Sequence, residues 1–499
     1  MKLILDGEIN QYYVQTLCMI FFPGEKFGAA EQTAKNGPEL RLRITKREQF
    51  VTAKATIKVG TEKATAIRKQ EYNKQYTDEQ IVKMACGAAV ISACGELLGY
   101  RPSWGILTGV RPSKVATDLL RRGVSKTRVK RILTSEYFVI PKKASLATDI
   151  ALQEQKLIGE PSRKDCSIYI SIPFCPTRCS YCSFVSYTSK KLLDLIPEYL
   201  DHLLADLKQT FATIRKLGLH LKTIYIGGGT PTILTADQLR RLLSEIAEQT
   251  DVSALEEYTL EAGRADTITA EKLAVAKEYG VTRTCVNAQS LCDEVLMNIG
   301  RCHTADDFMR AFAVARESGI PVINTDLIVG LPGDNFRTFA KTFDQVVALR
   351  PENLTVHTFC VKKASDILRQ DSNIYSIRGG DAGKCVDYSQ LQAQQEGYRP
   401  YYMYRQKNTV GNYENVGFAF PETEGRYNVY MMEEVHSIFA VGAGAVSKLV
   451  DFAPSDGGNA VIERLFYPKY PYEYLRDEST ADKMKTMVKF YQTHGLLKD

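Results

Sequence analysis

Apolar and polar residues alternate along the first part of the chain, as they do in strands with one buried face. The alternation covers residues 40–45, 50–59 and 62–67, and it predicts a small antiparallel sheet. Residues 78–98 instead carry apolar positions at helical spacing, and helix-forming residues are frequent from Lys114 onward. The pattern therefore predicts an N-terminal α+β domain.

From Ser167 onward, strand-like and helix-like segments alternate. Such repeated units imply parallel strands with right-handed crossovers, and six units make an open partial TIM-like (β/α)6 barrel rather than a closed eightfold one. Loops at the carboxyl ends of the strands converge in this α/β fold, so we expect the chemistry there. The predicted strands are residues 167–173, 222–227, 257–262, 281–289, 322–329 and 353–360.

We expect three parts: an N-terminal accessory domain (1–160), the barrel core (161–375) and a short C-terminal extension (376–499) that covers the barrel mouth. The chain has 499 residues, 44% of them hydrophobic, which is enough for at least two domains. Its net charge of +6 is modest for this length and is not a nucleic-acid footprint. The basic stretch 121–131 has helix-like spacing and is interpreted as a solvated helix face.

The N-terminal sequence has no charged-then-apolar leader. Its longest apolar run, residues 12–23, is interrupted by Gln15 and is too short to span a bilayer. We therefore expect a soluble, cytoplasmic protein with no membrane span and no nucleic-acid partner.

Three cysteines, Cys175, Cys179 and Cys182, lie in the run PFCPTRCSYC directly after the first predicted barrel strand. Thiolates spaced as CxxxCxxC can hold three irons of a 4Fe–4S cube and leave the fourth iron without a protein ligand. An open metal position is reactive. S-adenosylmethionine radical enzymes use this spacing, because the cofactor's amino and carboxylate groups can chelate the bare iron.

Two other interpretations of the cysteines are weaker. A structural zinc site needs four ligands, and the nearby candidate, Cys166, would lie roughly 30 Å away at the far end of a strand. Disulfides are disfavoured because the chain has 12 cysteines and no secretory leader, which indicates a reducing compartment.

Other predicted strands also end in residues that can contact a ligand. The second strand runs into Gly227–Thr232, where missing side chains let the backbone approach a ligand, although a glycine triplet alone usually marks a turn. Glu261, Gln289 and Asp326 lie at or near the ends of the next three strands. Charged strand residues are rarely buried unless paired, so ligand contact is favoured. Asp326 could instead satisfy a neighbouring helix start.

Taken together, these pieces resemble the oxygen-independent coproporphyrinogen III oxidase (dehydrogenase) family of radical S-adenosylmethionine enzymes, and look most like its HemZ type. The resemblance covers about residues 167–447. The pieces that carry it are residues 169–175, 179–182, 226–232, 300–304 and 324–332.

The resemblance implies that Cys175, Cys179 and Cys182 hold the 4Fe–4S cluster and that two S-adenosylmethionine molecules bind. One departure is Phe184, where the best-studied branch has a further cysteine that the cluster does not need. The other is a C-terminal part too short for the helical lid of that branch. The positions that match cofactor contacts are Tyr169, Tyr181, Gly228, Gly229, Thr230, Glu261, Gln289, Arg301, Asp326 and Cys360.

The implied reaction is the anaerobic oxidative decarboxylation of two propionates of coproporphyrinogen III to vinyl groups, which gives protoporphyrinogen IX for haem biosynthesis. The implied partners are this porphyrinogen and a low-potential electron donor such as flavodoxin or ferredoxin. Cationic candidates for the substrate carboxylates are Arg264, Arg283, Lys362, Lys363 and Arg405, each of which an ordinary surface charge explains at least as well.

Two other functions stay open. Relatives with the same cysteine run act as haem chaperones, and this function would need His303 or His357 as an axial ligand. The other function is that of a radical methyltransferase, which would use the second S-adenosylmethionine as methyl donor.

Overall fold

The computed structural model describes residues 1–23, 25, 27, 37–182, 184, 186–360, 380–406, 409–452 and 460–496. The chain forms two compact units. The first comprises the described residues of 1–153 together with residues 380–384 and 403–415, and the second comprises most of the other described residues. The three parts with boundaries at residues 160 and 375 stay a prediction.

The first unit contains a four-stranded sheet in the order β1-β2-β3-β4. The three predicted strands are present as β2 (Glu39–Lys46), β3 (Phe50–Val59) and β4 (Glu62–Glu71), and they pair antiparallel. A fourth strand, β1 (Lys2–Asp6), lies parallel to β2. Helix α1 (Gln11–Phe21) follows β1, and such a crossover returns the chain in the same direction. The sheet is thus mixed, not purely antiparallel.

Helix α2 (Asp78–Leu98) has the bounds that its periodicity predicts. A capping box between Thr77 and Gln80 starts it, and Gly99 ends it in the left-handed conformation (φ +62°). Within the described residues, α2 is the one helix long and apolar enough to cross a membrane, but 67% of the tested window is buried in the structure. It packs against β3 and β4, and burial on most sides accounts for its apolar composition.

Three further helices follow: α3 (Ser113–Arg121), α4 (Lys126–Ser135) and α5 (Pro141–Ile158). Helix α4 buries Val129, Ile132 and Leu133, while Lys126 and Arg128 are exposed. The basic stretch is therefore a solvated helix face, as predicted.

A buried carboxylate, Glu414, binds two partners within the first unit. Trp104 donates its indole N–H to Glu414 over 2.7 Å, and the Lys143 ammonium lies 2.5 Å from the other carboxylate oxygen. All three side chains are buried. Burial alone would raise the pKa of Glu414, but the charge of Lys143 and the hydrogen bonds lower it below its usual value.

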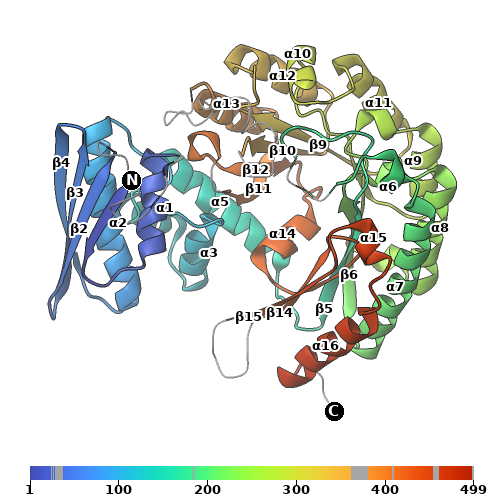
Figure 1. Ribbon diagram of the computed structural model, residues 1–499, viewed down its shortest axis with the longest axis horizontal. Coiled ribbons are helices and arrows are strands. Elements are labelled where there is room, and N and C mark those ends of the chain that lie inside the picture. The colour runs from blue at the N-terminus through green and yellow to red at the C-terminus, as the bar shows by residue number, and fades with distance from the viewer. Residues whose placement is uncertain are drawn as a thin grey trace. The chain divides into compact units, whose positions relative to one another are not determined.

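The second unit is built on a sheet of described strands in the order β11-β12-β10-β9-β8-β7-β6-β5-β13-β14-β15 (Figure 1). Six strands at the predicted places form its centre, and consecutive strands pair parallel. The strand predicted over residues 281–289 covers only Arg283–Cys285 and ends before Gln289. Because the sheet has two free ends, the barrel is open, as predicted. The six strands are β5 (Asp165–Ile172), β6 (His220–Gly228), β7 (Glu257–Glu261), β8 (Arg283–Cys285), β9 (Val322–Val329) and β10 (Asn353–Thr358).

The described residues after 380 widen this sheet at both edges. Strand β13 (Ser437–Val441) is buried throughout and pairs parallel with β5, and β14 (Val446–Asp451) and β15 (Val461–Phe466) continue antiparallel. At the other edge, β12 (Asn415–Ala419) pairs antiparallel with β10, followed by β11 (Arg399–Tyr404). These strands protect the edges of the central sheet.

Helices alternate with the central strands and lie along the outside of the sheet (Figure 1). Capping boxes start α8, α11 and α12, which explains their sharp N-terminal bounds. The helices between the central strands are α6 (Lys190–Leu193), α7 (Ile196–Lys216), α8 (Ala236–Gln249), α9 (Ala270–Glu278), α10 (Asp293–Asn298), α11 (Ala305–Glu317) and α12 (Phe336–Ala348). The helices after the last central strand are α13 (Ala382–Gln395), α14 (Arg426–Glu433), α15 (Pro471–Tyr474) and α16 (Thr480–Thr493).

Candidate functional site

The three cysteines of the CxxxCxxC run lie on the loop after β5. Cys175 and Cys179 are buried and Cys182 is half-buried, and none forms a disulfide. The Cys182 amide donates to the Cys179 carbonyl over 3.0 Å, which makes the loop a tight turn. Cys166 is buried inside β5, away from this turn. Cys166 thus does not supply this loop with the fourth ligand that a structural zinc site would need.

The Cys175 thiol lies in a mixed electrostatic environment. Burial raises its pKa, the Thr230 hydroxyl 3.2 Å from its sulfur lowers it, and the nearby Cys182 and Cys179 raise it further. Thiolates at Cys182 and Cys179 would thus repel a thiolate at Cys175. Iron bound to the cysteines would relieve this repulsion, because metals bind cysteine as the thiolate. The thiols thus fit three corners of a 4Fe–4S cluster.

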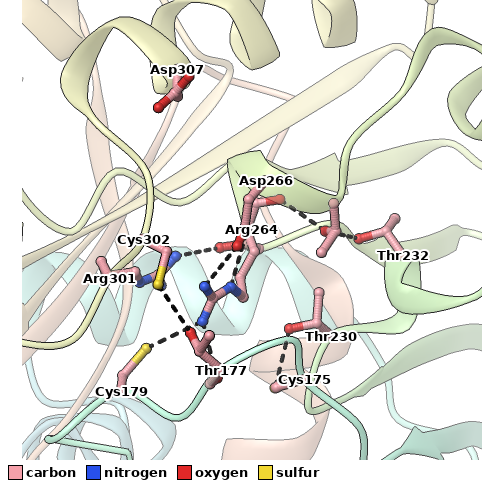
Figure 2. A network of polar contacts seen from close by, with 12 residues as sticks. Cys175, Thr177, Cys179, Thr230, Thr232, Arg264, Asp266, Arg301, Cys302 and Asp307 are labelled. Atoms are coloured by element: carbon pink, nitrogen blue, oxygen red, sulfur yellow. Dashed lines mark hydrogen bonds and ion pairs between the residues drawn. The ribbon is translucent and has the colours of Figure 1, made fainter. Parts of the chain in front are cut away.

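Arg264, on the loop after β7, holds the cysteine loop (Figure 2). One guanidinium nitrogen donates to the Thr177 carbonyl over 3.1 Å and lies 3.7 Å from the Cys179 sulfur. Asp266 binds the other side of the guanidinium through two hydrogen bonds of 3.0 and 2.8 Å. The prediction that Arg264 could bind substrate carboxylates is wrong for this conformation, because its donors are taken by the cysteine loop and Asp266.

Arg301 makes a second attachment to the cysteine loop. Its guanidinium donates to the Tyr181 hydroxyl over 3.1 Å and to the Gly263 carbonyl over 3.0 Å. Beside it, the Ser180 amide donates to the Ile299 carbonyl over 3.0 Å. The structure therefore brings two predicted cofactor contacts, Tyr181 and Arg301, together with the cysteines.

The end of β6 also runs against the cysteine loop. The Thr230 amide donates to the Phe174 carbonyl over 2.8 Å. A Cβ on Gly229 would lie 2.5 Å from that same oxygen, and Gly228 has φ of +112°. Glycine is thus required here by the approach of two backbones and by the conformation. These contacts hold Gly229 and Thr230 against Phe174, and the Thr230 hydroxyl lies 3.2 Å from the Cys175 sulfur.

Two carboxylates inside the barrel, Glu261 and Asp326, interact electrostatically. Burial raises the pKa of Glu261 to about 7, the Tyr225 hydroxyl that donates to it lowers this value, and the charge of Asp326 raises it. Asp326 keeps a pKa below its usual value despite burial, because His357, 3.7 Å away, and the Asn324 amide, 2.8 Å away, stabilise its charge. Glu261 is therefore poised to change charge near neutral pH, while Asp326 stays ionised.

An aromatic stack lies beside Glu261. The Tyr169 and Tyr225 rings are 6.0 Å apart at 20°, and the Tyr225 and Tyr427 rings are 4.6 Å apart at 24°. Tyr427 belongs to α14, far along the chain, and the sequence interpretation missed it because no motif marks this position. Tyr169 lies in β5.

Gln289 has an uncommon backbone conformation for a residue with a side chain, with φ of +61°. Two hydrogen bonds hold it against β9: its amide donates to the Asp326 carbonyl over 2.8 Å, and its carbonyl accepts from the Ile328 amide over 3.0 Å. Its buried side-chain oxygen has no hydrogen-bond partner in the described chain. Such strain and an unpartnered polar atom are typical of a ligand site.

Cys360 follows Phe359, whose amide donates to the Val329 carbonyl at the same end of the sheet.

The other cationic candidates lie elsewhere. Arg283 stands at the start of β8, next to Glu257 at the start of β7, and donates to the Thr423 and Glu424 carbonyls. It is thus at the opposite strand ends from the cysteines, and its predicted role is wrong. Arg405 belongs to the first unit and donates to Leu107 and Asn412. Lys362 and Lys363 lie outside the described residues.

Neither histidine considered for haem ligation has a free, exposed ring. His303 is 3% exposed, and burial together with the nearby Arg301 lowers its pKa to about 4. His357 is half-buried and pairs with Asp326.

The family model of the radical SAM superfamily matches residues 169–346, which contain the cysteine loop and four of the six central strands. The solved structure titled "Coproporphyrinogen III oxidase (HemN) from Escherichia coli is a Radical SAM enzyme" is similar to this chain with a TM-score of 0.50. It covers 67% of this chain and 73% of its own, and its 21% identity supports the fold alone. Fold and site define a radical SAM protein.

A relative from Bacillus subtilis (strain 168), named oxygen-independent coproporphyrinogen-III oxidase-like protein HemZ, is 34% identical over 467 residues, with 91% of each chain covered. The chain belongs to this HemZ family. A B. subtilis protein named heme chaperone HemW is 38% identical over 198 residues, which cover 39% of this chain and 51% of HemW. The similarity to the chaperone is thus restricted to part of both chains.

Proposed function

We propose that this protein is a radical SAM oxidoreductase that decarboxylates two propionates of coproporphyrinogen III to vinyl groups. The observation that carries the proposal is the cysteine loop, whose three free thiols are held by Arg264 and Arg301 beside the polar strand ends of an open barrel. The substrate class comes from the name of the HemZ relative, which matches over nearly its full length.

Cys175, Cys179 and Cys182 hold the cluster in this proposal. The bound 4Fe–4S cluster and S-adenosylmethionine supply one-electron cleavage of the sulfonium and a carbon radical that can remove a hydrogen atom. Arg264 compensates the thiolate charge at Cys179 and fixes the loop through Asp266. Oriented donors of this kind tune a cluster as well as hold it.

The other predicted contacts would position S-adenosylmethionine, of which we propose two molecules. Carboxylates suit an ammonium group and ribose hydroxyls, and aromatic rings suit a sulfonium or an adenine. Their role is to hold the reacting atoms in place and exclude water. They are Tyr169, Tyr181, Gly228, Gly229, Thr230, Glu261, Gln289, Arg301, Asp326 and Cys360.

Each propionate would lose one hydrogen atom from its β-carbon, then CO2 and one electron to an acceptor as the C=C bond forms. No proton has to be removed in this reaction, so it requires no general base, and Glu261 and Asp326 need only hold the cofactor. The electron donor would be a low-potential carrier such as flavodoxin or ferredoxin. We place the activity in the cytoplasm, where thiols stay reduced.

The chaperone alternative is favoured by the partial match to HemW and disfavoured by the burial of His303 and the pairing of His357. Mixing the purified protein with haem tests it: a Soret shift that disappears in His303→Ala or His357→Ala would support haem binding.

Anaerobic reconstitution with iron and sulfide, followed by incubation with S-adenosylmethionine, a reductant and coproporphyrinogen III, tests the proposed reaction. The expected product is lighter by two CO2 and four hydrogen atoms. 5′-Deoxyadenosine without this product would reject the substrate, and S-adenosylhomocysteine would indicate methyl transfer.

A further inference from the structure

Aromatic side chains cover the surface beside Cys175 and Cys182. The Tyr187 carbonyl accepts from the Cys175 amide over 3.0 Å, and its hydroxyl donates to the Lys469 carbonyl over 3.2 Å. The rings of Tyr187 and Tyr470 are 5.5 Å apart, and those of Tyr470 and Tyr472 are 5.4 Å apart. We name Tyr187, Tyr470 and Tyr472 the aromatic patch.

Much of the aromatic patch is open to solvent. Tyr470 is 44% exposed and Tyr472 43%. Large aromatic side chains that gather on a surface are typical of interaction sites, since isolated exposed hydrophobic residues are usually scattered. Phe184, which is 70% exposed, lies between Cys182 and Tyr187 in the chain.

Positively charged residues lie close to this patch along the chain. Arg178, Lys190, Lys191 and Lys469 are exposed, and none of them makes an ion pair within the part of the chain that the structure describes. Arg178 donates to the Ser186 carbonyl over 3.1 Å, next to Tyr187, and Lys469 is held by the Tyr187 hydroxyl. The same segments carry the carboxylates Asp194 and Glu473, so cations remain in excess.

The patch lies on the more exposed side of the cysteine loop. Cys175 and Cys179 are buried against Thr230 and Arg264, whereas Cys182 is half-buried, and its sulfur lies 3.9 Å from the Ser186 hydroxyl. Electron transfer slows steeply with distance, so a protein that reduces the cluster must bind close to it. Cys182 is the cysteine through which such a partner comes nearest.

We propose that the aromatic patch and its lysines form the docking surface for an acidic, low-potential electron-carrier protein. The carrier loses one electron and the cluster gains one, and the path passes Cys182. Opposite charges steer the two proteins together and the aromatic side chains supply the contact area. This inference rests on the cluster of the proposed function but not on the porphyrinogen substrate.

The test compares two reductants. K190E/K191E reverses two charges beside the patch, and K216E/K277E makes the same charge change on two exposed lysines of α7 and α9. For each reconstituted full-length protein, formation of 5′-deoxyadenosine is measured without porphyrinogen. The reductant is either reduced flavodoxin or dithionite with methyl viologen, which needs no docking surface.

The docking surface predicts that K190E/K191E slows the flavodoxin-driven rate about tenfold or more at low salt, while K216E/K277E does not. The dithionite-driven rates should stay equal, and added salt should slow the flavodoxin-driven wild type. Equal flavodoxin-driven rates in the two variants would overturn the docking surface, as would an equal loss with both reductants.

Direct binding of flavodoxin, measured by biolayer interferometry, gives a second readout. Affinity should fall in K190E/K191E and also in Y470S/Y472S, where the loss should be independent of salt. If the wild type forms no deoxyadenosine with dithionite, the proposed function fails. The binding measurements alone then test whether the patch is a docking surface. Undiminished binding by both variants would overturn it.

Discussion

The sheets of the two units differ in where their polar residues lie. In the first sheet, β3 alternates buried apolar residues such as Ala55 and Ile57 with exposed lysines. In the second, polar side chains occupy inner positions near the carboxyl ends of the strands, where Glu261 and Asp326 act on each other. The first sheet follows the pattern that stability favours, and the second departs from it where ligands are expected to bind.

Each unit nevertheless buries charge, and the partners differ. In the first unit, Lys143 and Trp104 satisfy Glu414 completely from within the chain. In the second, Arg264 supports the cysteine loop, and Gln289 keeps a buried oxygen without a partner in the described residues. Buried polar groups of the first unit thus contribute to folding, whereas those of the second are arranged around a site.

The largest effect should come from the cysteines. Cys179→Ser removes one of three proposed iron ligands, so the reconstituted protein should lose its 4Fe–4S absorption and all deoxyadenosine formation. Cys302→Ser is the matched control, since Cys302 is an exposed neighbour of the same loop, 3.8 Å from the Thr177 hydroxyl. Iron and sulfide analysis checks both. A full cluster in Cys179→Ser would contradict the assignment.

In the first unit, Lys143→Met should destabilise the fold by about 3–5 kcal/mol, because Glu414 would be left as a buried charge without its cation. Chemical denaturation measures the loss. The double variant K143M/E414Q should recover part of it, because it leaves no buried carboxylate. Lys83→Met, which breaks an exposed pair with Glu79, should leave the midpoint unchanged. An equal effect of the two single variants would show that burial of the pair is unimportant.

Arg264→Gln should loosen the cysteine loop and remove a positive charge from Cys179. Loss of a supporting donor of this type typically costs about 10–100-fold in metal affinity or activity. We expect slower deoxyadenosine formation in this range and a lower cluster potential, because a nearby cation favours the reduced state. Asp266→Asn keeps the arginine and should have a smaller effect. Potentiometry with EPR detection would contradict this role if the potential did not move.

The smallest effect concerns Glu261. Its pKa of about 7 lies above its ordinary value of 4.5, so the folded chain holds this proton more tightly than the unfolded chain does. The stabilising contribution is therefore present at low pH and is lost as the pH rises from about 4.5 to about 7. Glu261→Gln should gain stability relative to wild type over this window, by about 1–3 kcal/mol at pH 8.

Urea titrations of the cofactor-free protein between pH 5 and pH 8 measure this difference. Glu248→Gln, on the exposed face of α8, is the control and should show no such trend. A stability difference for Glu261→Gln that is constant over this pH range would contradict the raised pKa.

Regular patterns predict much of this fold. Helix α2 was predictable because its apolar positions recur at helical spacing, and the six central strands because strand-like segments alternate with helix-like ones. Strands β1 and β13 could not be predicted, because each has five residues and pairs with a strand far away in the sequence. Short segments acquire their structure from such pairing and not from their own pattern.

The site was predictable to the extent that its residues are close in sequence. The cysteine run and the glycine strand end were found in this way. The role of Arg264 could not be predicted, because its partner Cys179 lies 85 positions earlier in the chain. The contact between Tyr427 and Tyr225 could not be predicted either, because these two residues are far apart in the sequence. Contacts made only by tertiary structure leave no local signal.

The central claim is that three cysteines hold a cluster whose fourth iron binds S-adenosylmethionine. EPR spectra of the reconstituted, reduced protein, recorded with and without S-adenosylmethionine, test it most directly. The account predicts one 4Fe–4S cluster per chain whose spectrum changes when S-adenosylmethionine is added. A spectrum that is unaffected at saturating cofactor would contradict it, because the fourth iron would then be closed to the cofactor.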